Sequence, residues 1–259
     1  MSTERYGYGL VNDNKNQLLY AIGGLNGQTG KYLDSVETYN RQTNQWQFQA
    51  PLGQARSFFG STILNNTLYV CGGGRNGHFL NVCEYYLFDE NKWHLLTAPM
   101  PSERWGLALV AHSSSSSDGQ LYAIGGQSDT KFLNTMDRYD PETRQWTPMA
   151  NMQSARYLFA SAVFMDKIYV CGGLGNSDGK TCESYDPMTN QWKPIASMTD
   201  QRSNFKLIVF DDSLYAMGDD NPTNKIEIYD HKSDKWYYLL SVRLPVSLSG
   251  FGAATITSN

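Results

Sequence analysis

One short pattern recurs five times in this chain of 259 residues and constrains its fold more than any other feature. Each copy is a hydrophobic run that contains a tyrosine and ends in a glycine followed by a second glycine or an aspartate. Successive copies are 49, 53, 47 and 46 residues apart, so the chain is built from similar units of about 50 residues. The end pairs are Gly23-Gly24, Gly72-Gly73, Gly125-Gly126, Gly172-Gly173 and Gly218-Asp219.

An acidic residue and a tryptophan follow each pair in a fixed order, and after the first four pairs an arginine then opens the next hydrophobic run. Because the order is kept along the whole chain, the units share one local structure. The acidic residues are Glu37, Glu84, Asp137, Glu183 and Glu227. The tryptophans are Trp46, Trp93, Trp146, Trp192 and Trp236, and the arginines are Arg56, Arg104, Arg156 and Arg202.

Each unit is predicted to form four short strands. The second strand ends at the glycine pair, where the backbone turns without a Cβ in the way. The third and fourth strands are joined by turns such as Asp140-Pro141-Glu142-Thr143. A four-stranded sheet that repeats about every 50 residues is typical of a β-propeller blade. The 23 glycines and 34 aromatic residues (17 Tyr, 11 Phe and 6 Trp) suit an all-β fold with many tight turns.

Composition and charge argue against several function classes. The chain has 21 Lys and Arg against 25 Asp and Glu, a net charge of −4, whereas proteins that grip phosphate backbones usually carry a basic surplus. Nucleic acid is therefore not an expected partner. No hydrophobic run is long enough to span a membrane, and the first residues contain no apolar signal core. We expect a cytoplasmic protein, with the nucleus as the alternative.

The glycine pair, the acidic-x-Tyr segment and the spaced tryptophan resemble kelch repeats, and the match covers essentially the whole chain. Stretches 33–39 and 149–156 are most similar to the kelch domain of BTB-kelch (kelch-like) proteins. The resemblance implies a single kelch β-propeller over residues 1–259 with five four-stranded blades. We place the repeats at roughly 12–56, 57–104, 105–156, 157–202 and 203–243, followed by a closing strand at 244–259.

Two segments of the sequence could supply the strand that closes the ring. The segment from Ser249 to Thr257 matches the first strand of a unit, and in kelch-like relatives such a C-terminal strand completes blade one. The segment from Arg5 to Val11 also resembles a first strand. It is either a peripheral lead-in or part of a sixth, incomplete blade, and we favour five blades.

The chain shows no catalytic or metal-binding motif. The four cysteines, Cys71, Cys83, Cys171 and Cys182, lack zinc-site spacing. The two pairs Cys71/Cys83 and Cys171/Cys182 could lie on neighbouring strands, but in a reducing compartment we expect buried free thiols. The histidines share no repeat position, and no nucleophile elbow or phosphate loop occurs. We therefore predict no enzyme activity, no cofactor and no metal.

Most repeat residues are expected to be structural. The tryptophans and motif tyrosines should pack between blades, where large aromatic side chains fill the widening gap. The arginines should pair with the acidic residue of each unit, since a buried charge needs a partner.

In the kelch-like family one face of the propeller binds a partner peptide, and the resemblance carries that role to particular positions here. Two repeat positions line the face, one directly after the arginine and one just before a Leu-Asp/Asn element, and residues after the glycine pair add to them. The position after the arginine holds Ser57, Trp105, Tyr157, Ser203 and, near the C-terminus, Ser249. The second position holds Tyr32, Phe79 and Phe132, with Lys180 and Asn224 aligned less securely. The pair is followed by Leu25, Gly74, Arg75 and Gln127.

The leading functional hypothesis is a protein-interaction domain that recognises a substrate segment for a BTB-kelch adaptor of a cullin-3 ubiquitin ligase. The chain contains no BTB region, so it would contact cullin-3 only through a BTB domain in a longer protein, and the isolated domain should be a monomer. One alternative is an actin-binding or cytoskeletal scaffold, and a minor one is a metal-dependent kelch enzyme.

Overall fold

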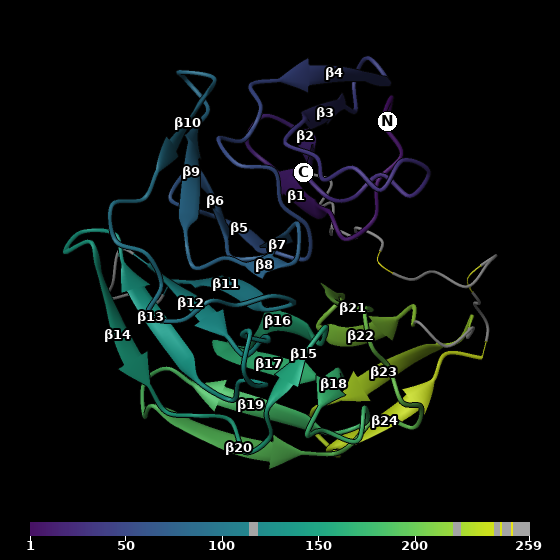
Figure 1. Cartoon of the computed structure of the whole chain (residues 1–259). Helices are drawn as coiled ribbons and strands as arrows, with labels where there is room; N and C mark the ends of the chain where they lie inside the picture. Colours follow the sequence, from purple (N-terminus) through teal and green to yellow (C-terminus); the bar gives the residue numbers. More distant parts are fainter. Residues whose placement is uncertain (114–118, 220–223, 241–243, 245–249, 251–259) are drawn as a thin grey trace.

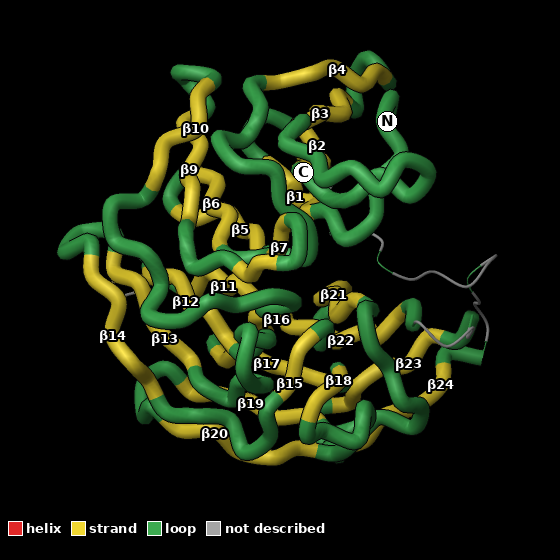
Figure 2. The backbone as a smooth tube through the Cα atoms, in the orientation of Figure 1, coloured by secondary structure: helices red, strands yellow, loops and turns green. Residues whose placement is uncertain are grey.

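The computed structural model describes residues 1–113, 119–219, 224–240, 244 and 250. These residues form strands and loops without a helix (Figure 2). Five four-stranded antiparallel sheets are arranged as the blades of a propeller (Figure 1). The prediction of an all-β propeller with five four-stranded blades is confirmed.

Each blade uses the strands of one repeat, in chain order from the centre outwards. Blade one contains β1 (Gly9–Asp13), β2 (Leu18–Ile22), β3 (Val36–Asn40) and β4 (Gln45–Gln49). Blade two contains β5 (Gly60–Leu64), β6 (Thr67–Cys71), β9 (Cys83–Leu87) and β10 (Lys92–Leu95). Blade three contains β11 (Ala108–His112), β12 (Gln120–Ile124), β13 (Met136–Asp140) and β14 (Gln145–Met149). Blade four contains β16 (Ala160–Phe164), β17 (Lys167–Cys171), β19 (Cys182–Asp186) and β20 (Gln191–Ile195), and blade five β21 (Lys206–Phe210), β22 (Ser213–Met217), β23 (Ile226–Asp230) and β24 (Lys235–Tyr238).

The N-terminal segment supplies the first strand of blade one. β1 pairs with β2 from Gly9↔Ile22 to Asp13↔Leu18, so it is neither a peripheral lead-in nor part of another blade. The first-strand position that we had assigned to the C-terminal segment is thus occupied by β1. Apart from residues 244 and 250, the predicted closing strand lies outside the described residues.

A closed ring of backbone hydrogen bonds surrounds the propeller axis. Each member donates its N–H to the carbonyl of the member before it, and all six have φ between 53° and 63°. Five members precede a described blade, and the sixth, Gly250, joins Asn204 of blade five to Gly7 of blade one. The ring therefore has one more member than there are described blades. The members are Gly7, Phe58, Gly106, Leu158, Asn204 and Gly250.

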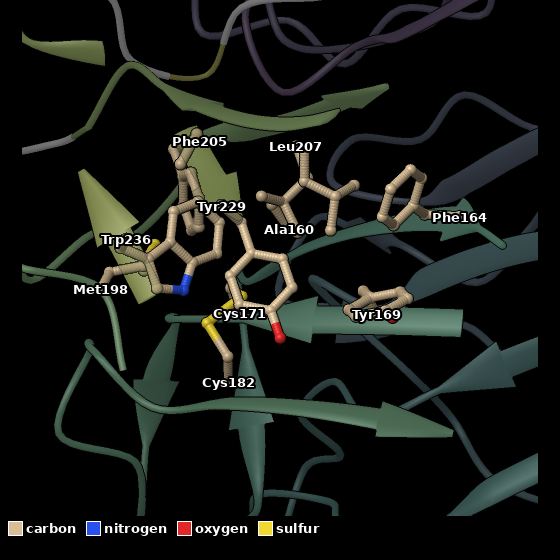
Figure 3. Close-up of a cluster of buried hydrophobic side chains, with 12 residues drawn as sticks. Ala160, Phe164, Tyr169, Cys171, Cys182, Met198, Phe205, Leu207, Tyr229 and Trp236 are labelled. Atoms are coloured by element: carbon tan, nitrogen blue, oxygen red, sulfur yellow. A yellow bond between two sulfur atoms is a disulfide. The ribbon is translucent and has the colours of Figure 1, made fainter. Parts of the chain in front are cut away.

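Four hydrophobic clusters fill the interfaces between successive blades from one to five. The cluster between blades four and five contains Trp236, Tyr229 and Phe205 (Figure 3). At each of these interfaces the tryptophan of one blade donates its indole N–H to an alanine carbonyl of the blade before it. The predicted packing of tryptophans between blades is thereby confirmed at these four interfaces. The bonds run from Trp93 to Ala50, Trp146 to Ala98, Trp192 to Ala150 and Trp236 to Ala196, at 2.9–3.0 Å.

The predicted pairing of arginines with acidic residues is confirmed in every blade, and Arg5 supplies the fifth arginine. Each guanidinium lies 2.6–3.1 Å from its carboxylate, and the arginine side chains are fully buried. Burial lowers the pKa of Arg56, Arg104 and Arg156, and the neighbouring carboxylate opposes that shift. The pairs are Arg5–Glu37, Arg56–Glu84, Arg104–Asp137, Arg156–Glu183 and Arg202–Glu227.

The expectation of free thiols is wrong. Cys71 of β6 lies directly opposite Cys83 of β9, and the two form a disulfide; Cys171 of β17 and Cys182 of β19 form the second (Figure 3). All four residues are at most 2% exposed. Antiparallel pairing brings the side chains of opposite residues together, which the spacing in sequence could not show. Disulfides persist mainly in oxidising compartments. The cysteines therefore give no support to the expectation of a reducing compartment.

Removing one partner of a buried ion pair should strongly lower the free energy of unfolding. In Glu183→Gln the Arg156 guanidinium, bonded to Glu183 at 2.9 Å, keeps its charge without a counter-charge. We expect the free energy of unfolding, measured by urea denaturation, to fall by about 3–5 kcal/mol. The control is Lys167→Met, which breaks a 3.8 Å pair with Asp186 whose side chains are 42% and 29% exposed. That change should cost no more than about 1 kcal/mol, and equal losses in both variants would contradict the prediction.

The disulfides should be detectable in protein isolated from cells without reductant. We expect mass spectrometry of alkylated, digested protein to recover Cys71 joined to Cys83 and Cys171 joined to Cys182. Reduction should lower the melting temperature by several degrees, because each bond constrains the unfolded chain by about 2–4 kcal/mol. Recovery of four alkylated free cysteines would instead support the expectation from the sequence.

Candidate partner-binding face

The residue after each arginine meets the residue after the glycine pair of the same blade. Isolated bridges join Trp105 to Gln127 and Gln127 to Phe132, and a similar pairing recurs in blades one, two and four. Tyr6 and Leu25 pair in blade one, and the short strands β15 (Arg156–Tyr157) and β18 (Leu174–Gly175) pair in blade four. In blade two, Ser57 bridges Gly74 of the hairpin β7 (Gly74–Arg75) and β8 (His78–Phe79). The repeat positions predicted to form one face therefore do lie together.

Aromatic rings form a continuous row across this face, which we call the aromatic ridge (Tyr6, Phe58, Phe79, Trp105, Phe132 and Tyr157). Trp105 is its centre, with ring centroids 4.9 Å from Phe58, 5.8 Å from Phe79 and 5.7 Å from Tyr157. Tyr157 stacks on Phe132 at 5.2 Å, and Phe58 contacts Tyr6 at 6.0 Å. The ridge thus extends over blades one to four.

The ridge is accessible at both ends and half-buried in the middle. Tyr6 and Phe132 are each 41% exposed. The Trp105 indole packs on Gly74, where a Cβ would lie only 2.8 Å from the indole Cδ1. The other blades carry a larger residue than glycine at this position, so Gly74 makes room for the indole. The resulting surface is wide, aromatic and fixed by ring-to-ring contacts, which is the composition of an interface hot spot.

Polar groups flank the ridge. Arg75 and His78 are exposed on the β7–β8 hairpin, and Gln127 is half-buried beside Trp105. Near blade five, a cavity of about 350 Å³ is lined by Asp178, Ser203 and Asp219 among others. Asp219 stands where the other blades have their second glycine, and its Oδ1 accepts the Ser203 N–H at 3.0 Å. The N–H groups of Lys180 and Thr181 lower the pKa of Asp178, which favours its negative form. A partner lying across the face would therefore meet the positive charge of Arg75 on one side and the negative charge of Asp178 on the other.

Not every residue predicted for the face reaches the surface. Ser57 and Ser203 are only 2% and 8% exposed, so their side chains offer a partner little area. Tyr32 is half-buried and bridges Leu25 at the rim of blade one. Ser249 lies outside the described residues.

The insecure alignment of Lys180 and Asn224 is corrected by the hydrogen bonds. The carbonyl of Lys180 accepts the Met198 N–H at 2.9 Å, as the carbonyl of Asn81 accepts the Met100 N–H in blade two. Lys180 is therefore equivalent to Asn81, and the counterpart of Phe79 in blade four is Asp178. The Lys180 ammonium donates to the Thr199 carbonyl at 2.8 Å, which holds the loop. Asn224, which accepts the Leu244 N–H, occupies the same repeat position.

Sequence reasoning missed two members of the ridge, Tyr6 and Phe58. Tyr6 directly follows Arg5, so the rule that selected Trp105 and Tyr157 would have found it had Arg5 been assigned to blade one. Phe58 has a φ of 53°, which a repeat pattern does not reveal. This left-handed backbone belongs to the central ring and turns the ring of Phe58 towards Trp105.

Within the described residues, no group of three or more His, Cys, Asp or Glu side chains is placed to hold a metal ion. A search of the same residues for a helix long and apolar enough to cross a membrane finds none.

Residues 1–173 match the KLHDC2/KLHL20/DRC7 Kelch-repeats domain, and residues 155–199 match the Kelch motif. The chain belongs to the kelch-repeat family. It carries a kelch-repeat domain of the kind that serves as a protein-interaction module. The predicted resemblance to BTB-kelch proteins is confirmed by the relatives.

Kelch-like protein 40 of Xenopus tropicalis is 34% identical over 150 residues, which cover 54% of this chain and 23% of that protein. Kelch-like protein 35 of Mus musculus is 30% identical over 173 residues, 64% of this chain and 28% of that protein. Beta-scruin of Limulus polyphemus is 29% identical over 172 residues, 61% of this chain and 18% of that protein. The chain thus matches no more than 28% of the length of these relatives.

The solved structure of YjhT superposes with a TM-score of 0.79, covering 96% of this chain and 86% of that one. The sequence identity is 18%, so this likeness concerns the fold alone.

The two kinds of tryptophan should differ in their effect on stability. Trp146→Ala removes a half-buried interface ring, its hydrogen bond to Ala98 and its contact with Tyr139, whose centroid is 5.1 Å away. We expect a loss of about 3–5 kcal/mol in the free energy of unfolding. Trp105→Ala should cost clearly less, because the Trp105 ring lies on the face and not in the interface between two blades. Equal losses by urea denaturation would show that Trp105 is part of the scaffold.

Proposed function

We propose that the aromatic ridge binds a segment of a partner protein, and that the chain is the substrate-recognition propeller of a BTB-kelch adaptor for a cullin-3 ubiquitin ligase. The observation that carries the first part is the ridge itself, a row of six rings on one face. Packing between blades does not need these rings, because the interface tryptophans already fill that role. Aromatic anchors on a rigid surface are what hot spots of protein interfaces consist of.

The chemistry of the face indicates the kind of segment that would fit. The ridge offers apolar area for hydrophobic side chains, and the cavity beside it presents the exposed carboxylate of Asp178. A segment with hydrophobic residues and a basic residue at one end would match both features. The assignment to a cullin-3 adaptor rests on the kelch-like relatives.

Binding should depend on the ridge. We expect the chain to capture its partner from lysate, and Trp105→Ala and Tyr157→Ala each to reduce capture at least tenfold, since hot-spot truncations cost about 2 kcal/mol or more. The control is Phe48→Ala, which removes a 61% exposed ring from the outer strand of blade one. It should leave capture unchanged, and all three variants should stay folded at the temperature of the assay, with one cooperative melting transition.

A second arm tests the ligase role. The chain fused to a BTB and BACK region should direct ubiquitin transfer to the captured protein in a reconstituted cullin-3 reaction, and the Trp105→Ala fusion should not. Capture without transfer would reject the adaptor role while leaving the interaction surface intact. Capture that survives both ridge substitutions would reject the ridge as the binding site.

A further inference from the structure

At three of the interfaces between blades, one side-chain oxygen accepts two hydrogen bonds. The oxygen belongs to the left-handed residue in the turn between the third and fourth strands. It receives the tyrosine O–H of its own blade and an alanine N–H of the blade before it. The three cases are Asn91 with Tyr86 (2.7 Å) and Ala50 (3.2 Å), Asn190 with Tyr185 (2.9 Å) and Ala150 (3.0 Å), and Asp234 with Tyr229 (2.8 Å) and Ala196 (2.9 Å).

The interface between blades two and three lacks this oxygen. The equivalent residue is Arg144, in Thr143-Arg144-Gln145-Trp146, where blade four has Thr189-Asn190-Gln191-Trp192. Arg144 keeps the left-handed backbone, with a φ of 57°, although arginine is not favoured there as asparagine is. A guanidinium group has no lone pair to offer a donor. The substitution therefore replaces an acceptor with a cation.

The two donors are still in place. Trp146 donates to the Ala98 carbonyl at 3.0 Å, and Tyr139 packs on Trp146 as in the other blades. Neither the Tyr139 O–H nor the Ala98 N–H has a hydrogen-bond partner among the described residues. Tyr139 as a whole is only 2% exposed, and it lines the cavity described next.

A cavity of about 180 Å³ lies at this point, lined by residues of blades two and three. The Tyr139 ring and Arg144 line it, together with Tyr69, Tyr85 and residues 95–97. It has room for several waters, since one water occupies about 30 Å³. Arg144 forms no ion pair within the described ranges, and the Oδ1 atom of Asp140 accepts the N–H groups of Glu142 and Thr143.

The protonation state of the site is suited to donation. Burial raises the pKa of Tyr139, and the positive charge of Arg144 only partly opposes that shift. Burial likewise raises the pKa of Tyr69. Both hydroxyl groups therefore keep their protons at neutral pH, and the site presents hydrogen-bond donors and one cation.

We propose that this cavity binds a small oxyanion of the phosphate or carboxylate type. One oxygen of the anion takes the place that the asparagine oxygen has at the neighbouring interfaces and accepts the Tyr139 O–H and the Ala98 N–H. The Arg144 guanidinium binds a second oxygen, the fork geometry for which arginine is suited. The strand β13 (Met136–Asp140) runs away from the hairpin that carries Phe132, so this site is at the opposite end of the blade from the aromatic ridge.

The test is thermal unfolding and calorimetric titration of the whole chain with inorganic phosphate, with acetate in a parallel arm, each against sodium chloride of equal ionic strength. We expect either oxyanion to raise the melting temperature where chloride does not, because a ligand that binds only the folded state stabilises it. A larger shift with phosphate would assign the site to phosphate-type ligands, and a larger shift with acetate to carboxylates.

Two substitutions make the test specific. Arg144→Asn restores the acceptor of the repeat, so it should raise the melting temperature without anion and remove the response to anion. Tyr139→Phe should weaken anion binding about tenfold, the effect of losing one hydrogen bond to a charged group. In anion-free buffer it should leave the melting temperature unchanged. Its control, Tyr185→Phe, loses the bond to Asn190 and should lower the melting temperature in every buffer.

The proposal fails if neither oxyanion shifts the wild-type melting temperature beyond the chloride reference. It also fails if Arg144→Asn responds to anion as the wild type does, because the effect would then come from another surface. Loss of stability in Tyr139→Phe equal to that in Tyr185→Phe, without anion, would show that Tyr139 already has a partner.

Discussion

The buried pair between an arginine and a carboxylate is the interaction on which the rest of the propeller depends. Its guanidinium binds the carboxylate of the blade that follows, while its own backbone carbonyl accepts the N–H of the second glycine in the blade before, as Arg156 does from Gly126. The carboxylate also accepts backbone N–H groups of the loop between blades, such as Gln153 to Glu183. One residue thus joins two blades and the loop between them. Removing either charge of the pair lowers the free energy of unfolding, because the other charge is then buried without a partner.

The pair also positions the candidate binding face. Tyr6, Trp105 and Tyr157 each follow an arginine directly, so their backbone is fixed by the guanidinium network and by the bridge to the residue after the glycine pair. A surface held in this way loses little conformational freedom when a partner binds. The scaffold is shared by the described blades, and the two proposed binding sites lie where the blades differ: the ridge on one face and Arg144 at the other end of blade three.

Blade three shows how sequence variation is compensated. Pro101 stands where blades two, four and five have a residue that donates its N–H to the acidic partner, as Thr199 donates to Glu227 at 2.6 Å. Proline has no N–H, and the acidic residue of this blade is the shorter Asp137. The ion pair to Arg104 is kept at 2.6 Å. At Arg144 no such compensation is visible within the described residues, and this is why that interface carries the proposed oxyanion site.

The sequence by itself determined the kind of blade, because a glycine pair, a carboxylate and a tryptophan in fixed order leave one local structure for each unit. It favoured five blades but left open where the segment from Arg5 to Val11 belongs, which the pairing of β1 with β2 decided. It also determined which repeat positions share a face, since each position recurs at the same place in every blade. Only the tertiary structure decided which rings touch, that Ser57 and Ser203 are buried, and that Lys180 aligns with Asn81. These depend on left-handed residues and hairpin lengths that shift side chains by one or two positions. The cysteine pairing was also decided there, because only the register of the neighbouring strands places Cys71 opposite Cys83 and Cys171 opposite Cys182.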